Sequence, residues 1–192
     1  MNFLAHLYLS RHNEELMIGN FIADSVKGSS LSAYSPGIAK GIRMHRAIDS
    51  FTDSHPVFLN SVRRLRPRYH KYSGVIVDIY YDHFLARNWE QHAVDSLSEF
   101  TRKVHVLLRA NHDLFPPRSK HFMNYMFANE IPIPYATISG IEKVLQGMSR
   151  RAKFESGMDQ AGKELLEWGT EFESEFNSFM PDVKEFTKQF NL

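Results

Sequence analysis

The sequence has no cysteine among its 192 residues, which excludes disulfide scaffolds, cysteine-ligated zinc sites and thiol catalysis. No apolar run approaches the roughly 20 residues that a membrane-spanning helix requires. The opening segment MNFLAHLYLSRHNEE has neither a basic start nor a cleavage site of small residues, so we expect no signal peptide. P-loop, GxGxxG and GxSxG motifs are also missing. We therefore expect a cytoplasmic protein without a membrane partner.

Sustained period-two alternation with hairpin signals is absent too, and the apolar spacing is helical nearly throughout. Ser35-Pro36 and His55-Pro56 have the residue types that begin helices. The segments 96–99 and 139–142 both match the capping box, in which a serine and a glutamate satisfy backbone donors of the first turn. The sequence therefore predicts one all-α domain over residues 1–192 with seven or eight helices.

The small net charge of +1 hides an asymmetry along the chain. Residues 1–150 contain 18 Lys and Arg against 13 Asp and Glu, whereas residues 151–192 contain 5 against 9. Five cations gather in the stretch SVRRLRPRYHKY, namely Arg63, Arg64, Arg66, Arg68 and Lys71. This run is a solvated helix end, a partner of the acidic C-terminal segment of the same chain, or a docking patch for an acidic protein or nucleic acid.

Two carboxylates interrupt the segment 74–89, which is otherwise apolar on nearly all sides and therefore reads as a central, buried helix. Asp78 and Asp82 are spaced i and i+4, so both project from one face, and His83 follows directly. Because two close buried acids repel each other, we expect a cation between them, either an arginine or a metal ion.

The helix expected from residue 36 to residue 54 shows the same intrusion of polar residues into an apolar stripe. His45 and Asp49 form a second i, i+4 pair on the stripe that faces the core, and Asp53 lies one turn further on. Asp24 ends another apolar helical stretch, and His6 sits inside the opening apolar run. Three segments thus each direct an acid or an imidazole toward the interior.

Carboxylate oxygen with imidazole nitrogen, and no sulfur, is the ligand set of manganese, iron, magnesium or catalytic zinc. The two i, i+4 pairs together favour a divalent metal centre. A structural alternative stays open, in which Asp78 and Asp82 form a buried network with Arg43 or Arg46 and carry no chemistry.

Five segments suggest a family, and they occur in the order MNFLAHLYLS, GNFIADSVKG, GIRMHRAIDSFTDSHP, VDIYYDHFLARNW and VLQGMSRR. Together they resemble the acyl carrier protein phosphodiesterases, from residue 1 to about residue 151. The resemblance implies an all-helical fold distantly similar to the HD-type metal phosphohydrolases. It also implies hydrolysis of the phosphodiester that links 4′-phosphopantetheine to a serine of holo-acyl carrier protein. The implied partner is that carrier protein, not nucleic acid.

Position by position, the resemblance implies metal ligands at His6, Asp24, His45, Asp49, Asp78 and Asp82 and catalytic groups at Arg46, Asp53 and His83. The implied cofactor is a divalent ion, with manganese expected and magnesium or iron as alternatives. Such an ion lowers the pKa of a water and neutralises phosphate charge. Arg46 or Arg43 would contact the phosphate, and His83 or Asp53 would protonate the departing serine oxygen.

Two other functions compete with this one. The first is an HD-like phosphohydrolase that acts on a small nucleotide or another phosphodiester at the same metal centre. The second is a non-catalytic helical binding module whose polar cluster is only structural. Stoichiometric metal in the purified protein would exclude the second, and comparing hydrolysis of nucleotides with that of holo-acyl carrier protein would decide the first.

Overall fold

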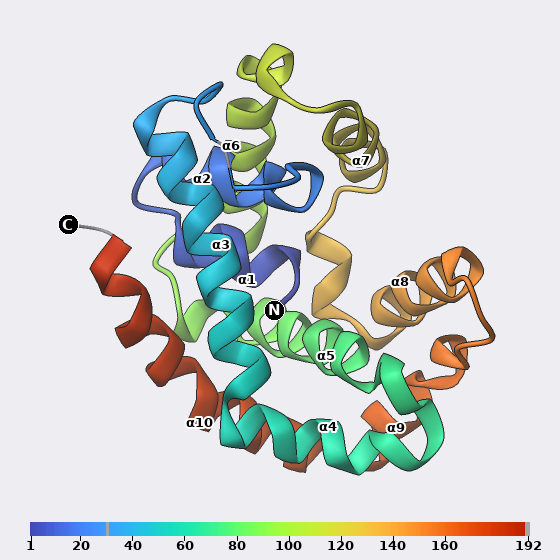
Figure 1. Ribbon diagram of the computed structural model, residues 1–192. Helices are drawn as coiled ribbons and strands as arrows, with labels where there is room; N and C mark the ends of the chain where they lie inside the picture. Colours follow the sequence, from blue (N-terminus) through green and yellow to red (C-terminus); the bar gives the residue numbers. More distant parts are fainter. Residues whose placement is uncertain (30, 191–192) are drawn as a thin grey trace.

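The computed structural model describes residues 1–29 and 31–190, and within these ranges the chain is helical and forms no β-strand (Figure 1). The prediction of an all-α fold is therefore confirmed. The α-helices are α1 (Phe3–Leu9), α2 (Glu14–Ile22), α3 (Pro36–Ser54), α4 (Pro56–Tyr69), α5 (Ser73–Arg87), α6 (Leu97–Ala110), α7 (Pro117–Ala128), α8 (Ile138–Arg151), α9 (Gly162–Glu167) and α10 (Gly169–Thr187). The short helices α1 and α9 come in addition to the seven or eight expected, because six or seven residues give too little apolar periodicity to be recognised.

The helix starts show which capping signals act. The Ser35 side chain accepts a hydrogen bond from the Ile38 amide at the start of α3, with Pro36 as first helical residue. The capping box of residues 96–99 forms in full at α6. The box predicted at 139–142 is wrong, because the chain is already extended at Thr137, whose side chain caps α8 by accepting from the Gly140 amide.

Helix α5 crosses the middle of the molecule and packs against α1, α4 and α10 (Figure 1). Its aromatic side chains Tyr80, Tyr81 and Phe84 are at most 1% exposed. Tyr81 and Phe84 both contact Phe176 of α10. The uniformly apolar character of this segment is thus explained by burial on all sides, as the sequence predicted.

Helices α2 and α3 lie against each other at close range, and this contact positions the polar residues described below. Gly19 and Gly41 meet at the crossing, and a Cβ built on Gly19 would lie 2.7 Å from the Gly41 Cα. Because neither residue has a side chain, the two backbones approach closely. The 3-10 turn Ala23–Ser25 then follows α2 and carries Asp24 beside α3.

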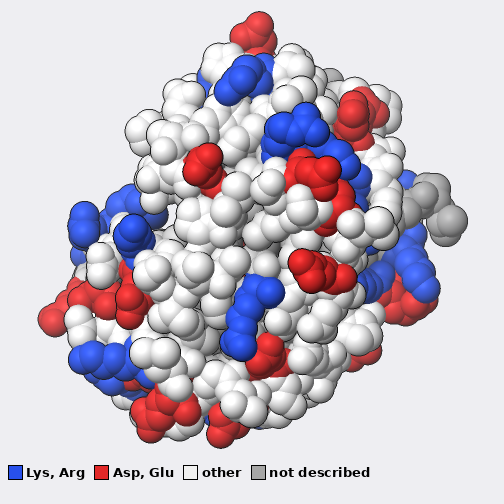
Figure 2. All heavy atoms as spheres, turned by 180° about the vertical axis from the view of Figure 1, so that it is seen from behind, with Lys and Arg blue, Asp and Glu red and all other residues white. Residues whose placement is uncertain are grey.

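The surface seen from behind mixes charges of both signs with wide uncharged areas (Figure 2). Lysines and arginines on this face lie next to acidic side chains, so the face has no extended field of one sign. None of the described helices is both long and apolar enough to cross a membrane. The cytoplasmic location expected from the sequence stays a prediction.

Candidate metal centre

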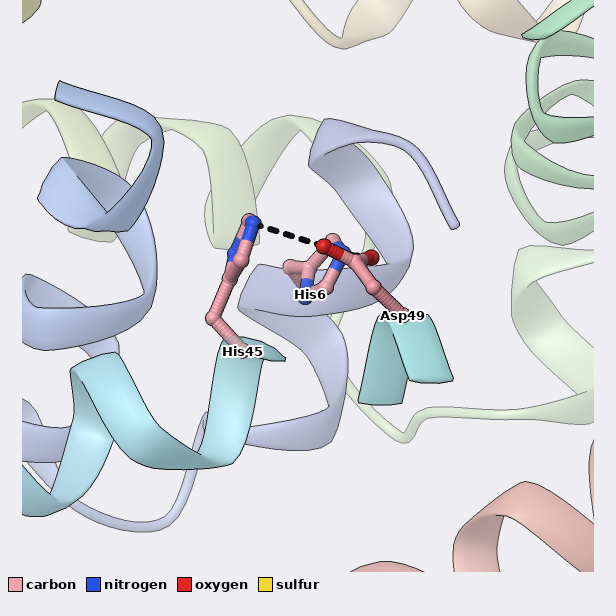
Figure 3. A group of neighbouring side chains, drawn as sticks. All are labelled: His6, His45 and Asp49. Atoms are coloured by element: carbon pink, nitrogen blue, oxygen red, sulfur yellow. Dashed lines mark hydrogen bonds and ion pairs between the residues drawn. The ribbon is translucent and has the colours of Figure 1, made fainter. Parts of the chain in front are cut away.

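Three of the expected ligands come together where α1 lies beside α3. His6 of α1 and His45 of α3 stack their rings with centroids 3.9 Å apart. Asp49, one turn after His45, places Oδ1 at 3.1 Å from His6 Nε2 and Oδ2 at 3.2 Å from His45 Nε2. Figure 3 shows both rings gathered around this carboxylate. One ligand atom of each residue lies within 4.8 Å of the others, so the group can hold a metal ion.

Two further expected ligands border this group. Asp24 Oδ1 lies 3.3 Å from His45 Nε2, and its side chain is 77% exposed. Asp78 lies on the other side, where its Oδ1 is 3.2 Å from the amino group of Met1; that amino group is also 3.3 Å from Asp49 Oδ1. The carboxylates therefore form an arc around His45, His6 and the buried ammonium of Met1.

The charge state of the two histidines differs because their surroundings differ. Burial, together with the neighbouring His45, lowers the pKa of His6 to about 4. Burial also disfavours the charged form of His45, but hydrogen bonds to Asp24 and Asp49 outweigh it and raise its pKa to about 9. The Asp49 carboxyl is desolvated, yet its bonds to His45 and His6 hold its pKa well below the usual range.

The group therefore carries a neutral imidazole next to a protonated one that is held between two carboxylates. A metal ion binds the same ligand atoms only after such a proton leaves, so the arrangement is one in which a divalent cation replaces a proton. Nδ1 of His6 lies 3.1 Å from Asn20 Oδ1, and Nε2 lies 3.1 Å from both Asp49 Oδ1 and the Met1 carbonyl oxygen, so Asn20 holds the ring with Nε2 toward the carboxylate. Asn20 was missed from the sequence, because an asparagine within an apolar helix carries no ligand signal of its own.

Comparison with known proteins points in the same direction. The family model described as acyl carrier protein phosphodiesterase matches residues 1–183. A protein named acyl carrier protein phosphodiesterase from Photorhabdus laumondii is 30% identical, and the match covers 96% of this chain and 94% of that protein. A protein of the same name from Serratia proteamaculans is also 30% identical, over 100% of both chains. One from Escherichia coli O45:K1 is 32% identical over 96% of both chains. The chain belongs to the acyl carrier protein phosphodiesterase family. No solved structure matches it.

A cavity of about 440 Å³ lies beside the two histidines of this candidate metal group, that is, the group of His6, His45 and Asp49. His6, His45 and Asp24 line one part of it, and α7 and α8 supply another wall with Arg118, His121 and Arg151 among the lining residues. The two arginines were not singled out from the sequence. They were missed because an exposed arginine fits an ordinary polar helix face and interrupts no apolar pattern.

Asp82, expected as a ligand, does not join the group. Its carboxylate is fully buried and accepts hydrogen bonds from the Leu4 and Ala5 amides, at 2.8 and 3.0 Å, so it caps the first turn of α1. Burial raises its pKa to about 7, although the two amide bonds lower it. His83 lies apart as well: its Nδ1 is 2.7 Å from the Tyr135 carbonyl oxygen, and Tyr135 lines the cavity.

The other expected catalytic residues, Asp53 and Arg46 of α3, do not belong to the group of His6, His45 and Asp49. Asp53 is exposed, one turn beyond Asp49, and its charge helps to raise the pKa of Asp78, which burial brings to about 6. Arg46 donates from Nη2 to the Val26 carbonyl oxygen at 2.9 Å. Neither residue lines the cavity. The arginine–carboxylate network considered as an alternative for Asp78 and Asp82 is not formed, since Asp78 pairs with the amino group of Met1 and Asp82 with backbone amides.

The five cations of α4 and of the 3-10 turn His70–Tyr72 that follows it fall into two sets. Arg64 binds Glu175 of α10 through both terminal nitrogens, at 2.7 and 2.9 Å, and Arg68 pairs with Glu164 of α9. These two arginines therefore join α4 to the acidic C-terminal segment. Arg63, Arg66 and Lys71 are exposed and form no ion pair with a described carboxylate, although Lys71 lies over the ring of Phe154.

Proposed function

We propose that this protein hydrolyses the phosphodiester between 4′-phosphopantetheine and a serine of holo-acyl carrier protein, and so releases the apo-carrier. Membership of the family over residues 1–183 supports the reaction. The observation that carries the proposal is the buried group of His6, His45 and Asp49 at a cavity of about 440 Å³, within the usual size of small-ligand sites. A long, narrow substituent on a protein surface can enter such a cavity.

His6, His45, Asp49 and Asp24 are the residues that would hold a divalent ion, which we propose to be manganese, with magnesium or iron as alternatives. Two imidazoles and two carboxylates suit manganese and iron, and they lack the thiolates of structural zinc sites. When bound, the ion supplies Lewis acidity to the phosphate oxygens and lowers the pKa of a nearby water. Asp78 is not proposed to bind the ion. It adds negative charge next to Asp49, since the Met1 amino group contacts both carboxylates.

The chain's own groups have distinct proposed tasks. Asn20 orients His6 by accepting from its Nδ1, so that Nε2 faces Asp49. Asp53, expected to protonate the departing serine oxygen, is exposed and does not line the cavity, so its position lends that role no support. His83 would act only indirectly, by holding the Tyr135 backbone at the cavity wall. The ligand role proposed for Asp82 and the phosphate contact proposed for Arg46 gain no support from the contacts that these residues make.

The test is incubation of the protein with holo-acyl carrier protein and manganese, followed by measurement of the intact mass of the carrier. We expect the carrier to lose the mass of the phosphopantetheine arm, and a chelator to prevent that loss. A carrier of unchanged mass with manganese, magnesium and iron alike would contradict the proposal. Faster hydrolysis of a nucleotide than of holo-carrier would favour the small-substrate phosphohydrolase, and a protein without stoichiometric metal would favour the binding module.

A further inference from the structure

The cavity has a polar wall that neither the metal group nor the proposed reaction yet uses. Arg118, His121 and Tyr125 of α7 are spaced i, i+3 and i+7, so they lie along one face of the helix, and all three line the cavity. Each carries a hydrogen-bond donor, and each is exposed. Val144 and Met148 of α8 add apolar lining. One wall of the cavity is therefore rich in donors.

The metal group creates a need for such donors. Asp24, Asp49 and Asp78 place three carboxylates around the proposed reaction site, and a phosphodiester is itself an anion. One divalent ion and the ammonium of Met1 together supply three positive charges against four negative groups, so binding of the substrate phosphate requires further positive charge. The cations expected for this task do not supply it, because Arg46 donates to a backbone carbonyl and neither Arg46 nor Arg43 lines the cavity.

Arg118 is placed to meet that need. Its neighbour Ser119 donates a hydrogen bond to Ser25 Oγ at 2.8 Å, which ties the start of α7 to the turn that carries Asp24. Arg118 and Asp24 thus belong to the same rim of the cavity. No described carboxylate forms an ion pair with Arg118, so its guanidinium is not already neutralised within the described chain.

We propose that Arg118 binds the substrate phosphodiester in the cavity that it lines together with His6, His45 and Asp24, with His121 one turn further along as a second donor. The proposal rests on the proposed function. A guanidinium offers two parallel N–H donors to two phosphate oxygens, which neutralises charge and fixes the orientation of the phosphate. Cavity lining and charge therefore identify Arg118 as a substrate-binding residue of the proposed reaction. The sequence alone does not mark it, because it does not interrupt an apolar stripe.

The experiment compares Arg118→Gln and Arg118→Lys with Arg102→Gln, which removes an exposed arginine of α6 away from the cavity. Inorganic phosphate serves as a probe without a protein surface, both as a competitive inhibitor and in calorimetric titration of the manganese-loaded protein. We expect Arg118→Gln to lower kcat/KM for holo-carrier about 100-fold and to weaken phosphate binding at least about tenfold. Arg118→Lys should recover part of both, because it keeps the charge and loses the bidentate geometry. Arg102→Gln should match the wild type, and all variants should bind manganese equally.

Several outcomes would overturn the proposal. If Arg118→Gln changes KM for the carrier and leaves phosphate binding at the wild-type value, Arg118 contacts the carrier surface rather than the phosphate. Unchanged kinetics, or a wild-type protein that binds no phosphate, contradict it as well. If holo-carrier is not hydrolysed at all, the proposed function fails, whereas loss of phosphate binding in Arg118→Gln alone still assigns the anion site to this residue.

Discussion

At the scale of single residues, the geometry of Asp49 explains how one short side chain serves two histidines from different helices. Its two oxygens point in different directions, Oδ1 toward His6 of α1 and Oδ2 toward His45 of its own helix. The spacing i, i+4 brings His45 beside it, while the stacked rings hold His6 at the required distance. Removing the negative charge of this carboxylate should therefore weaken the contacts of Asp49 with both histidines.

We expect Asp49→Asn to weaken binding of manganese by about 100-fold or more, since an amide replaces the charged ligand that faces both imidazoles. Calorimetric titration with manganese measures this directly. Asp113→Asn is the matched control, because Asp113 is fully exposed and its carboxylate contacts only His112 among the described side chains. Equal affinities of the two variants would show that the ion binds elsewhere.

The raised pKa of Asp82 should make the free energy of unfolding depend on pH. Its pKa is raised to about 7 in the folded protein, mainly by burial, from about 3.8 when unfolded. Between these values the folded state holds a proton that the unfolded state has lost, so stability falls as the pH rises from about 4 to about 7. The slope is roughly 1.4 kcal/mol for each pH unit in that window.

Urea unfolding of metal-free protein at pH 5 and at pH 7.5 measures the free energy of unfolding at both ends. The lowered pKa of His6 gives the opposite slope over part of this range, so the contribution of Asp82 is the difference between the wild type and the variant. We expect the free energy of unfolding of the wild type to fall relative to that of Asp82→Asn between pH 5 and pH 7.5, because the amide cannot ionise. The difference between the wild type and Asp113→Asn should not change with pH. If the difference between the wild type and Asp82→Asn does not change either, the buried carboxyl is not the group responsible.

The contrast between Asp82 and the metal group also shows what residue patterns can predict. His6, His45 and Asp49 were found because polar side chains interrupted apolar stripes, and that signal reports burial. The same signal marked Asp82, which is buried for another reason, as acceptor for two amides of α1. Burial is thus visible in the sequence, but the partner of a buried carboxylate depends on which helix end the fold brings beside it.

At the scale of helices, the approach of α2 to α3 sets the position of His45 relative to Asp24. The starts of α3, α4 and α6 followed from local signals such as Ser35-Pro36, whose effect needs no distant contact. Which helices pack together did not follow from those signals. Gly19 and Gly41 looked like ordinary interruptions in the sequence, and only the fold reveals that they face each other.

Gly19→Ala should therefore be strongly destabilising. The added methyl would meet the Ile38 carbonyl oxygen and lie 2.7 Å from the Gly41 Cα, and these backbone atoms cannot rotate away. We expect a loss of about 1–3 kcal/mol or more in the free energy of unfolding, and weaker manganese binding as α3 shifts. The measurement is urea unfolding together with calorimetry.

Gly74→Ala is the control for this helix pair, since nothing lies within 4 Å of a Cβ at Gly74 in α5. It should be neutral or stabilise by up to about 1 kcal/mol, because alanine favours the helix. A Gly19→Ala variant as stable as Gly74→Ala would mean that α2 and α3 are further apart than described.

At the scale of the whole molecule, the charge asymmetry of the sequence has a partly internal explanation. The basic α4 and the acidic C-terminal segment attract each other, and the ion pairs Arg64–Glu175 and Arg68–Glu164 join them. Composition predicted the two opposite charges, and the pairing was one of the readings open for them. The three exposed cations that remain, Arg63, Arg66 and Lys71, still make α4 and the turn after it a proposed docking surface for an acidic carrier.

Docking and folding roles can be separated, because different residues would serve each. Arg63→Glu with Arg66→Glu should raise KM for holo-carrier several-fold at low salt and flatten its dependence on salt, since long-range attraction acts on association and is screened beyond roughly 8 Å at physiological salt. The value of kcat should hold, because neither residue lines the cavity. Arg64→Gln should instead lower the free energy of unfolding by leaving Glu175 without its partner. Arg102→Glu with Arg109→Glu on α6 makes the same change in net charge away from α4, so an equal rise in KM there would mean that overall charge, and not the α4 surface, attracts the carrier.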